Sequence, residues 1–330
     1  MRYRTLGRLG WQVSEIGYGM WGIAGGPGGF TGADYDTAPG CLDLAVELGC
    51  NFFDTAAAYG RGISEQMLGA LLRRHPDREL YVATKIAPKN MEWPPGPGDT
   101  LDDVYPPDYI RQCAGQSLDR LGRIDLLQLH VWEDRWAKDE RWQSVLGDLK
   151  REGVIRAVGI SVNRWEPANC LAALDTGVVD VIQVIYNIFD QAPQDELFPR
   201  TQRDGIGVIA RVPFDEGTLA GALSAGSTWP EGDWRNTYFG PENLGPSVEH
   251  LDSLTADVGE AMPLPELALP ELALRFILAN PAVSTVIPGM RKTEHVRANL
   301  AVSDDGELDS DLLARLRRHR WDRVPAWWSG

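Results

Sequence analysis

Short apolar segments alternate with longer amphipathic stretches along most of the chain. The short segments are bounded by turn residues, which is typical of parallel strands covered on both faces. The longer stretches, with apolar residues at every third or fourth position, are typical of helices that cover such a sheet. The pattern therefore predicts parallel strands alternating with outer helices. The eight expected strands are 15–19, 51–55, 80–86, 125–131, 155–161, 181–186, 207–212 and 284–287.

This alternation favours an α/β fold of the closed (β/α)8 barrel (TIM barrel) type, and an open doubly wound sheet is the alternative. A chain of 330 residues suits one such barrel, which takes about 250 residues before insertions. We predict a single domain over 1–330, with an N-terminal hairpin over 1–12 and a C-terminal helix and tail over 301–330. In the helix expected over 64–72, Ser64 is expected to cap the first turn.

Three connections, each after an expected strand, are too long for plain turns: 22–34, 87–107 and 214–247. In a parallel barrel, such connections surround the face where the C-terminal ends of the strands meet. Within the last one we expect a lid over 215–246, because its glycines allow hinging and its aromatic side chains offer surface to bury. The candidate walls of a substrate pocket are Trp21, Trp132, Trp229 and Trp234. Packing of these loop aromatics against the body of the protein is the alternative interpretation.

The formal net charge of −15 argues against nucleic acid as a partner, because phosphate contacts require clustered Lys and Arg. No apolar run approaches the ~20 residues that a membrane span needs, so we expect no membrane association. The N-terminal residues show no apolar stretch of the kind found in signal peptides, and we expect a cytoplasmic protein. The four cysteines form no C-x-x-C pair, and we expect reduced structural thiols.

Two glycine motifs suggest other functions but are incomplete. The segment 17–22 matches G-x-G-x-x-G, yet the glycine-rich residues after it cannot begin the helix that a dinucleotide fingerprint requires. The segment 159–163 resembles a hydrolase nucleophile elbow but ends in Asn rather than Gly. Four further histidines have no metal-ligand spacing, so we predict surface positions for them and no metal site. They are His75, His250, His295 and His319.

Four residues that can together move a proton lie at or just beyond the C-terminal ends of expected strands: Asp54, Tyr59, Lys85 and His130. A lysine inside a barrel needs an anion, because burying an unpaired ammonium is very costly, and Asp54 can supply it. We expect the ammonium to lower the pKa of the Tyr59 phenol, which would make it a usable acid and base near neutral pH. The four lack an electron source, which indicates a bound hydride donor.

The segment 53–65 reads F-D-T-A-A-A-Y-G-R-G-I-S-E and resembles the F-D-T-A-x-x-Y-G-x-G-x-S-E segment of the aldo-keto reductases. Thr84-Lys85 and Leu129-His130 follow in the order that this family shows, and the resemblance covers nearly the whole chain. It implies the (β/α)8 barrel, with Tyr59 as the general acid that protonates a carbonyl oxygen. It also implies that Lys85 and Asp54 tune the phenol, that His130 orients or polarises the carbonyl, and that a nicotinamide cofactor supplies the hydride.

By the same resemblance, Ser161, Asn163 and Gln183 hold the nicotinamide carboxamide. The segment 287–299 resembles the part that binds the adenosine phosphate. In that segment the resemblance implies contacts from Gly289, Arg291, Lys292, His295 and Asn299. Arg291 and Lys292 are expected to pair with a 2′-phosphate, and Asn299 to face the adenine.

Two departures from the family pattern concern the cofactor. Where many members place an aromatic residue in a Y/W-S-P-L stretch, this chain reads Ala210-Arg211-Val212-Pro213-Phe214, and we expect Arg211 to stack by its guanidinium face, with Pro213 beside it. His295 stands where relatives often have Arg or Gln, and a mostly neutral histidine would bind a 2′-phosphate weakly. We therefore expect NADPH/NADP+ as the cofactor, with NADH as the alternative.

The predicted function is the reduction of a small-molecule aldehyde or ketone, with the reverse oxidation of an alcohol available to the same residues. A cofactor-binding regulatory or redox-sensing subunit is the alternative from another functional class. The family that this chain resembles also includes such subunits, for example the β subunits of potassium channels. A third interpretation is hydride-dependent modification of a sugar or another polar metabolite. The sequence favours no one oligomeric state.

Overall fold

The structure, a computed structural model, describes residues 1–25, 31–32, 34–221, 223–261 and 268–323. Eight strands form one parallel sheet in the order β3 to β10, each paired with the next strand along the chain. The strands are β3 Tyr18–Gly19, β4 Phe52–Asp54, β5 Tyr81–Ile86, β6 Ile124–Leu129, β7 Ile155–Ser161, β8 Val181–Ile185, β9 Gly207–Arg211 and β10 Thr285–Val286. Parallel bridges from Ile16 to Val286 and from Gly19 to Gly289 join the first strand to the last.

These bridges close the sheet, so the predicted (β/α)8 barrel is confirmed and the open doubly wound sheet is wrong. Strands β3 and β10 have only two residues each and are shorter than the sequence pattern predicts. They meet through single bridges, and the flanking apolar residues Ile16 and Ile287 are nevertheless buried. An apolar run therefore marks burial here over a longer stretch than it marks strand pairing.

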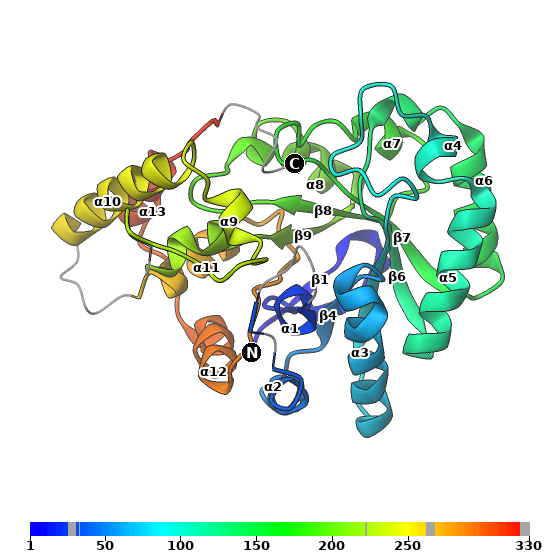
Figure 1. Cartoon of the computed structure of the whole chain (residues 1–330), viewed down its shortest axis with the longest axis horizontal. Coiled ribbons are helices and arrows are strands. Elements are labelled where there is room, and N and C mark those ends of the chain that lie inside the picture. The colour runs from blue at the N-terminus through cyan, green and yellow to red at the C-terminus, as the bar shows by residue number, and fades with distance from the viewer. Residues whose placement is uncertain (26–30, 33, 222, 262–267, 324–330) are drawn as a thin grey trace.

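The helices lie outside the barrel (Figure 1). Helices α3, α5 and α6 follow one another in contact along one side, and α10 packs against α13 on another. The helices are α1 Trp21–Ala24, α2 Ala38–Glu47, α3 Ile63–Arg74, α4 Leu101–Val104, α5 Pro107–Leu121, α6 Glu140–Arg151, α7 Leu171–Asp175, α8 Leu197–Asp204, α9 Arg235–Tyr238, α10 Leu244–Ala261, α11 Leu269–Leu278, α12 Thr293–Ala301 and α13 Ser310–Arg317.

The predicted cap of helix α3 is wrong. Gly62, with φ 93°, precedes the helix, which starts at Ile63, and Ser64 lies inside the first turn. The Ser64 hydroxyl is buried and accepts a hydrogen bond of 2.7 Å from Thr55 Oγ1. The Ser64 hydroxyl thus fixes the chain just beyond strand β4, between Asp54 and Tyr59.

The N-terminal end of the barrel is closed by an antiparallel hairpin of β1 (Tyr3–Thr5) and β2 (Gln12–Ser14). Its turn lies directly on the barrel, because a Cβ added at Gly7 would approach the backbone nitrogen of Gly207 to 2.4 Å. The Trp11 ring stacks on Tyr81 at a centroid distance of 5.1 Å. With this end covered, a ligand must reach the barrel from the opposite, C-terminal face.

None of the described helices is long and apolar enough to cross a membrane. All four cysteines are free thiols, and Cys41, Cys50 and Cys170 are buried.

Candidate active site

Asp54, Lys85 and Tyr59 are in contact at the C-terminal end of the barrel. Asp54 is the last residue of β4 and Lys85 lies in β5, and both side chains are buried. The Lys85 Nζ donates hydrogen bonds to Asp54 Oδ1 and, at 2.9 Å, to the carbonyl oxygen of Thr55. It also lies 3.4 Å from the Tyr59 hydroxyl. The ammonium is therefore neutralised on one side and faces the phenol on the other.

Two glutamines hold the second oxygen of Asp54. Gln183 donates to Asp54 Oδ2 at 2.8 Å and Gln128 donates to the same atom at 3.1 Å. Gln183, expected from the sequence at the nicotinamide, thus contacts the Asp54 carboxylate, and Gln128 was not predicted. Gln128 could have been predicted from its position two residues before His130, because alternate residues of a strand share one face. The register, which pairs Lys85 with Gln128, brings both into the barrel.

The pKa values identify the protonated groups. Burial favours the neutral amine of Lys85, but the adjacent Asp54 outweighs it and raises the pKa of Lys85. Burial raises the pKa of the Tyr59 phenol, and the opposing charge of Lys85 only reduces this effect. The expectation that Lys85 lowers the phenol pKa below its ordinary value is therefore wrong, because desolvation of the phenolate is the larger effect. Tyr59 keeps its proton, as a proton donor must.

His130 follows strand β6 and completes the group. Its ring lies edge-on to Tyr59, with centroids 5.7 Å apart. Burial, followed by the charges of Lys85 and Arg211, lowers the pKa of His130 well below its ordinary value, so the imidazole is neutral. Its Nδ1 is buried without a hydrogen-bond partner among the described residues. A polar atom of this kind is available to a ligand.

Two tryptophans lie beside this group, and a third packs against one of them. The ring centroids of Trp21 and Tyr59 are 6.3 Å apart, and those of Trp234 and Trp21 are 6.1 Å apart. Trp93 packs edge-on against His130 at 4.6 Å and remains 41% exposed. Trp93 was missed as a site residue, and its signal was an aromatic side chain within the long connection 87–107.

The two other predicted pocket tryptophans make their ring contacts, among the described residues, with neither Tyr59 nor His130. Trp229 stacks on Phe239 at 5.1 Å, within a cluster that also contains Tyr238 and Trp234. Trp132 is buried, and its ring contacts among the described residues are with Trp136 and Trp142. The structure therefore does not bring Trp132 to Tyr59, because the chain after β6 turns this side chain into the apolar core.

The predicted nicotinamide residues lie at or just beyond the ends of β7 and β9, and in the middle of β8. Ser161, the last residue of β7, is buried and pairs in register with Gln183. The Asn163 side chain accepts a hydrogen bond of 2.8 Å from the Trp165 amide. Arg211, the last residue of β9, donates to the carbonyl oxygen of Val162 at 3.1 Å, and its Nε is buried without a hydrogen-bond partner among the described residues. Buried Pro213 follows two positions later.

The predicted phosphate segment lies beside the first strand, with exposed Gly289 bridged to Gly19. Arg291 donates to the carbonyl oxygen of Thr31 at 2.9 Å, and Lys292 is largely exposed. Burial lowers the pKa of Arg291, and the charge of Arg235 adds to this effect. Further along, the segment includes exposed His295 and buried Asn299, both in helix α12.

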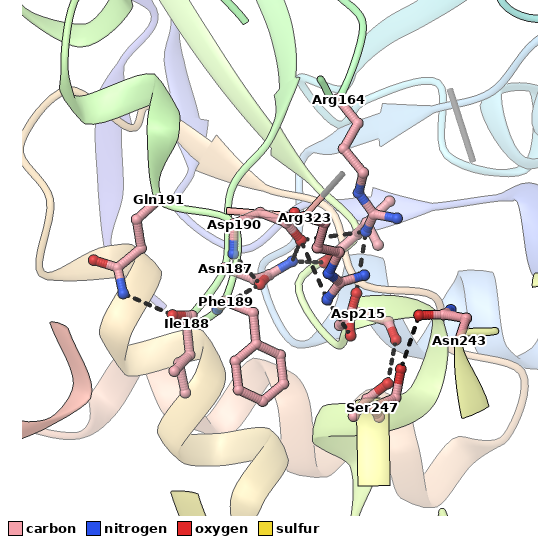
Figure 2. A network of polar contacts seen from close by, with 12 residues as sticks. Arg164, Asn187, Ile188, Phe189, Asp190, Gln191, Asp215, Asn243, Ser247 and Arg323 are labelled. Carbon is pink, nitrogen blue, oxygen red and sulfur yellow. Dashed lines mark hydrogen bonds and ion pairs between the residues drawn. The ribbon is translucent and has the colours of Figure 1, made fainter. Parts of the chain in front are cut away.

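A buried charged network, which the sequence did not reveal, joins the loops after β7, β8 and β9 (Figure 2). Arg164 donates to Asp190 Oδ2 at 3.2 Å and to Asp215 Oδ1 at 3.1 Å. Tyr238 donates to Asp215 Oδ1 at 2.8 Å, and Arg323 from the chain after α13 pairs with Asp215 as well. No local sequence pattern predicts this network, because its residues come from segments that are far apart in the chain.

The loop that carries Asp215 is conformationally strained. Val212, Asp215 and Glu216 have positive φ values of 54°, 46° and 55°, which non-glycine residues rarely adopt. Asn187 holds this loop by donating to the carbonyl oxygen of Val212 at 3.0 Å. Backbone strain of this kind persists where surrounding contacts over-determine it. The network thereby fixes the backbone that follows Arg211.

The segment expected to be a lid is partly folded onto the barrel. It contains a 3-10 helix over Asp215–Ala220, helix α9 and the start of α10, and Tyr238 and Phe239 are buried. Asp233 accepts hydrogen bonds from the amide (2.9 Å) and hydroxyl (2.6 Å) of Thr31. Residue 222 of this segment, like 26–30 and 33 of the first long connection and 324–330 of the expected tail, lies outside the described residues.

The residues present fit a nicotinamide cofactor. Two buried polar atoms, His130 Nδ1 and Arg211 Nε, lie at the ends of β6 and β9 and have no hydrogen-bond partner within the described segments. Arg291 lies in the chain just before α12, which begins at Thr293, and a helix N-terminus with adjacent cations suits a phosphate. A hydride donor held along these strand ends would reach the Tyr59 side of the barrel mouth.

Comparisons with known proteins agree with this geometry. The chain matches the profile described as the Aldo/keto reductase family over residues 15–320. It is 32% identical over 324 residues to the uncharacterized oxidoreductase YqkF of Bacillus subtilis (strain 168), covering 97% of this chain and 96% of that protein. It is 29% identical over 336 residues to the NADH-specific methylglyoxal reductase of Escherichia coli (strain K12), covering 94% and 96%.

Among solved structures, the holo form of aldo-keto reductase AKR11C1 from Bacillus halodurans superposes with a TM-score of 0.76. The two are 28% identical, and the alignment covers 99% of each chain.

Proposed function

The chain belongs to the aldo/keto reductase family and is an NAD(P)H-dependent oxidoreductase, and we propose that it reduces a small aldehyde or ketone to the alcohol. The contact that carries this proposal is the 3.4 Å approach of Lys85 Nζ to the Tyr59 hydroxyl, beside the Lys85–Asp54 pair. It supplies a protonated phenol next to a fixed cation. That is the arrangement that a carbonyl oxygen requires as it gains negative charge.

In the proposed reaction, Tyr59 donates its proton to the carbonyl oxygen. Lys85 stabilises the phenolate that remains, and Asp54, held by Gln128 and Gln183, keeps the ammonium in place. The neutral imidazole of His130 orients the carbonyl as a hydrogen-bonding group. When bound, the nicotinamide supplies the hydride to the carbonyl carbon. The reverse sequence, with the Tyr59 phenolate as base, oxidises an alcohol.

We favour NADPH as the cofactor, with Ser161 and Asn163 at the nicotinamide and Arg291 and Lys292 at the 2′-phosphate. Arg291 supports this assignment because it keeps a guanidinium, half-buried, before helix α12. The NADH-specific E. coli relative makes NADH the alternative to test. We place the activity in the cytoplasm.

The pocket walls support a substrate with an apolar or flat face. Trp21 lies beside Tyr59, Trp93 packs against His130, and Trp234 packs against Trp21. Aromatic rings bind apolar surfaces and sugar faces alike. Relatives named D-threo-aldose 1-dehydrogenase (Pseudomonas sp) and pyridoxal 4-dehydrogenase (Microbacterium luteolum) extend the test panel to sugars and aromatic aldehydes.

The test is cofactor oxidation, followed by absorbance, with a panel that contains methylglyoxal, an aldose and aromatic aldehydes. We expect multiple turnovers with at least one carbonyl, and loss of these turnovers in Tyr59→Phe. Tight binding of NADPH with no more than one turnover on every carbonyl would contradict the proposal. That result would instead favour a redox-sensing role.

A further inference from the structure

Arg211 occupies a distinctive position at the mouth of the barrel. It ends strand β9 and pairs in register with Ile185 of β8. Its Nη2 donates to the carbonyl oxygen of Val162, the residue between Ser161 and Asn163. The guanidinium is thus tied to the segment proposed to hold the nicotinamide, and its charge acts on both Tyr59 and His130.

Within the part of the chain that the structure describes, no carboxylate forms an ion pair with Arg211, whereas Arg164 and Arg323 each pair with Asp215. Asp54 is already paired with Lys85. The charge of Glu216 acts on Arg211, but Glu216 forms no ion pair with it among the described residues, and burial raises the pKa of Glu216.

Arg211 is nevertheless protonated at neutral pH. Burial and the neighbouring charge of Arg164 lower the pKa of Arg211 to about 10, which still lies well above neutral pH. The proposed nicotinamide site therefore contains, in addition to the neutralised Lys85–Asp54 pair, one positive charge that forms no ion pair with the described residues. Charges in such partly buried sites are screened much less than charges in water.

The two redox forms of the cofactor differ in charge at the ring. Transfer of a hydride to a carbonyl carbon, with the Tyr59 proton going to the oxygen, turns a neutral dihydronicotinamide into a positively charged nicotinamide. A fixed cation beside the ring repels the charged form and leaves the neutral form nearly unaffected. An aromatic residue at the same place would not discriminate in this way.

We propose that Arg211 sets the redox preference of the cofactor site, so that the protein binds the reduced nicotinamide more tightly than the oxidised one. This inference rests on the proposed function. Its consequence is that oxidised cofactor leaves readily after carbonyl reduction and inhibits weakly as a product. It also means that the bound couple is a milder reductant than the couple in solution, because tighter binding of the reduced form raises its potential.

The experiment measures the dissociation constants of NADPH and NADP+ by quenching of intrinsic tryptophan fluorescence. The variant Arg211→Met removes the charge and keeps a long side chain, and Arg211→Lys keeps the charge. Arg156→Met is the matched control, because Arg156 lies near the start of β7, at the opposite end of the barrel, and pairs with Asp125 at 2.7 Å. It changes the net charge of the protein equally.

In Arg211→Met we expect the dissociation constant of NADP+, divided by that of NADPH, to fall about tenfold. This change corresponds to a shift of about 30 mV in the reduction potential of the bound two-electron couple. Arg211→Lys should keep most of the wild-type ratio, and Arg156→Met all of it. The inhibition constant of NADP+ against NADPH should fall in Arg211→Met as well. Arg211→Gln provides a second neutral variant, and thermal melting checks that each variant is folded.

A ratio that stays unchanged while both affinities fall would overturn the inference and leave Arg211 as a structural contact. A ratio that rises in Arg211→Met would overturn it too. Absence of saturable binding of either cofactor to the wild-type protein would contradict the proposed function itself. The two failures are therefore distinguishable.

Discussion

Arg323 and Asp215 form an ion pair in which Arg323 Nη2 lies 2.8 Å from Asp215 Oδ2. Both side chains are almost completely buried. Asp215 follows strand β9, whereas Arg323 belongs to the chain after the last helix. Arg164 contacts the other oxygen of the same carboxylate, and the pKa of Asp215 is lowered to about 2 by the two arginines despite the opposing effect of burial. The pair therefore fixes the last described residue of the chain beside the strained loop that follows Arg211.

Replacing Arg323 by methionine should destabilise the protein strongly. Removing one partner of a buried ion pair leaves an uncompensated charge and costs about 3–5 kcal/mol. The free energy of unfolding, from denaturant titration, measures this cost. Arg320→Met is the control, because its pair with Asp195 is partly exposed and such pairs contribute ~1 kcal/mol or less. Equal losses in the two variants would contradict a special role for the buried pair.

Acid should weaken the same pair. The pKa of Asp215 falls from 3.8 to about 2 on folding, so the unfolded chain binds more protons than the folded protein between these values. The stability that Asp215 contributes is therefore complete above about pH 4 and is lost as the pH falls toward 2. In Asp215→Asn this part of the acid dependence should disappear from unfolding curves recorded across that range. Persistence of the full dependence would assign it to other carboxylates.

Tyr59→Phe should remove nearly all carbonyl reduction while the affinity for NADPH stays close to that of the wild type. The change deletes the proton donor and keeps the ring that packs against Trp21 and His130. General acid catalysis contributes roughly 10²-fold or more, so steady-state rates should fall by at least this factor. Retention of more than a tenth of the rate, at unchanged cofactor affinity, would remove Tyr59 from the role of acid.

Lys85→Met should move the pH profile of carbonyl reduction toward higher pH and lower the rate. The reduction needs a protonated phenol, and Lys85 opposes the rise in the pKa of Tyr59 that burial causes. Without the ammonium the phenol should keep its proton to higher pH, so the alkaline limb of kcat moves upward. Lys85→Arg, which keeps a positive charge, should move it less. An unchanged limb would show that Lys85 does not act on Tyr59.

The barrel, and the meeting of the candidate catalytic residues at one end of it, were predictable because both follow from local pattern. Residues at or beyond the C-terminal ends of parallel strands meet on one face, and Asp54, Lys85 and His130 stand at such ends. The direction of the Tyr59 pKa was not predictable, because it depends on how completely the folded chain excludes water. The burial of Trp132 was not predictable either, because a tryptophan that follows a strand can line a pocket or pack in the core.

The contacts of Asp215 with Arg164 and Arg323 required the three-dimensional structure for another reason. The three residues come from different loops, and no spacing in the sequence relates them. By contrast, Gln128 could have been found, because it stands two positions before His130 on a recognisable strand and shares its face.

Arg291→Ala should weaken NADPH binding more than NADH binding. The guanidinium now donates to the carbonyl oxygen of Thr31, and we expect it to contact the 2′-phosphate that only NADPH carries. A charge-assisted contact contributes about 1.5–3 kcal/mol, and it should weaken with added salt. Lys292→Ala, at a more exposed position, is the comparison and should have the smaller effect. Equal wild-type affinities for the two cofactors at low salt would contradict the assignment.

The segment 215–246 should respond to cofactor in its central part, which we expect to form the lid. Tyr238 is buried and held by Arg164 and Asp215, so amides near it should exchange slowly with or without cofactor. Exposed residues between Ser224 and Gly232 should exchange rapidly in the free protein and slowly with NADPH bound. Asp233→Ala, which breaks the contacts with Thr31, should reduce this protection while strands β5 to β8 remain unchanged. If hydrogen exchange shows the central residues already protected without cofactor, they are packed structure and no lid closes there.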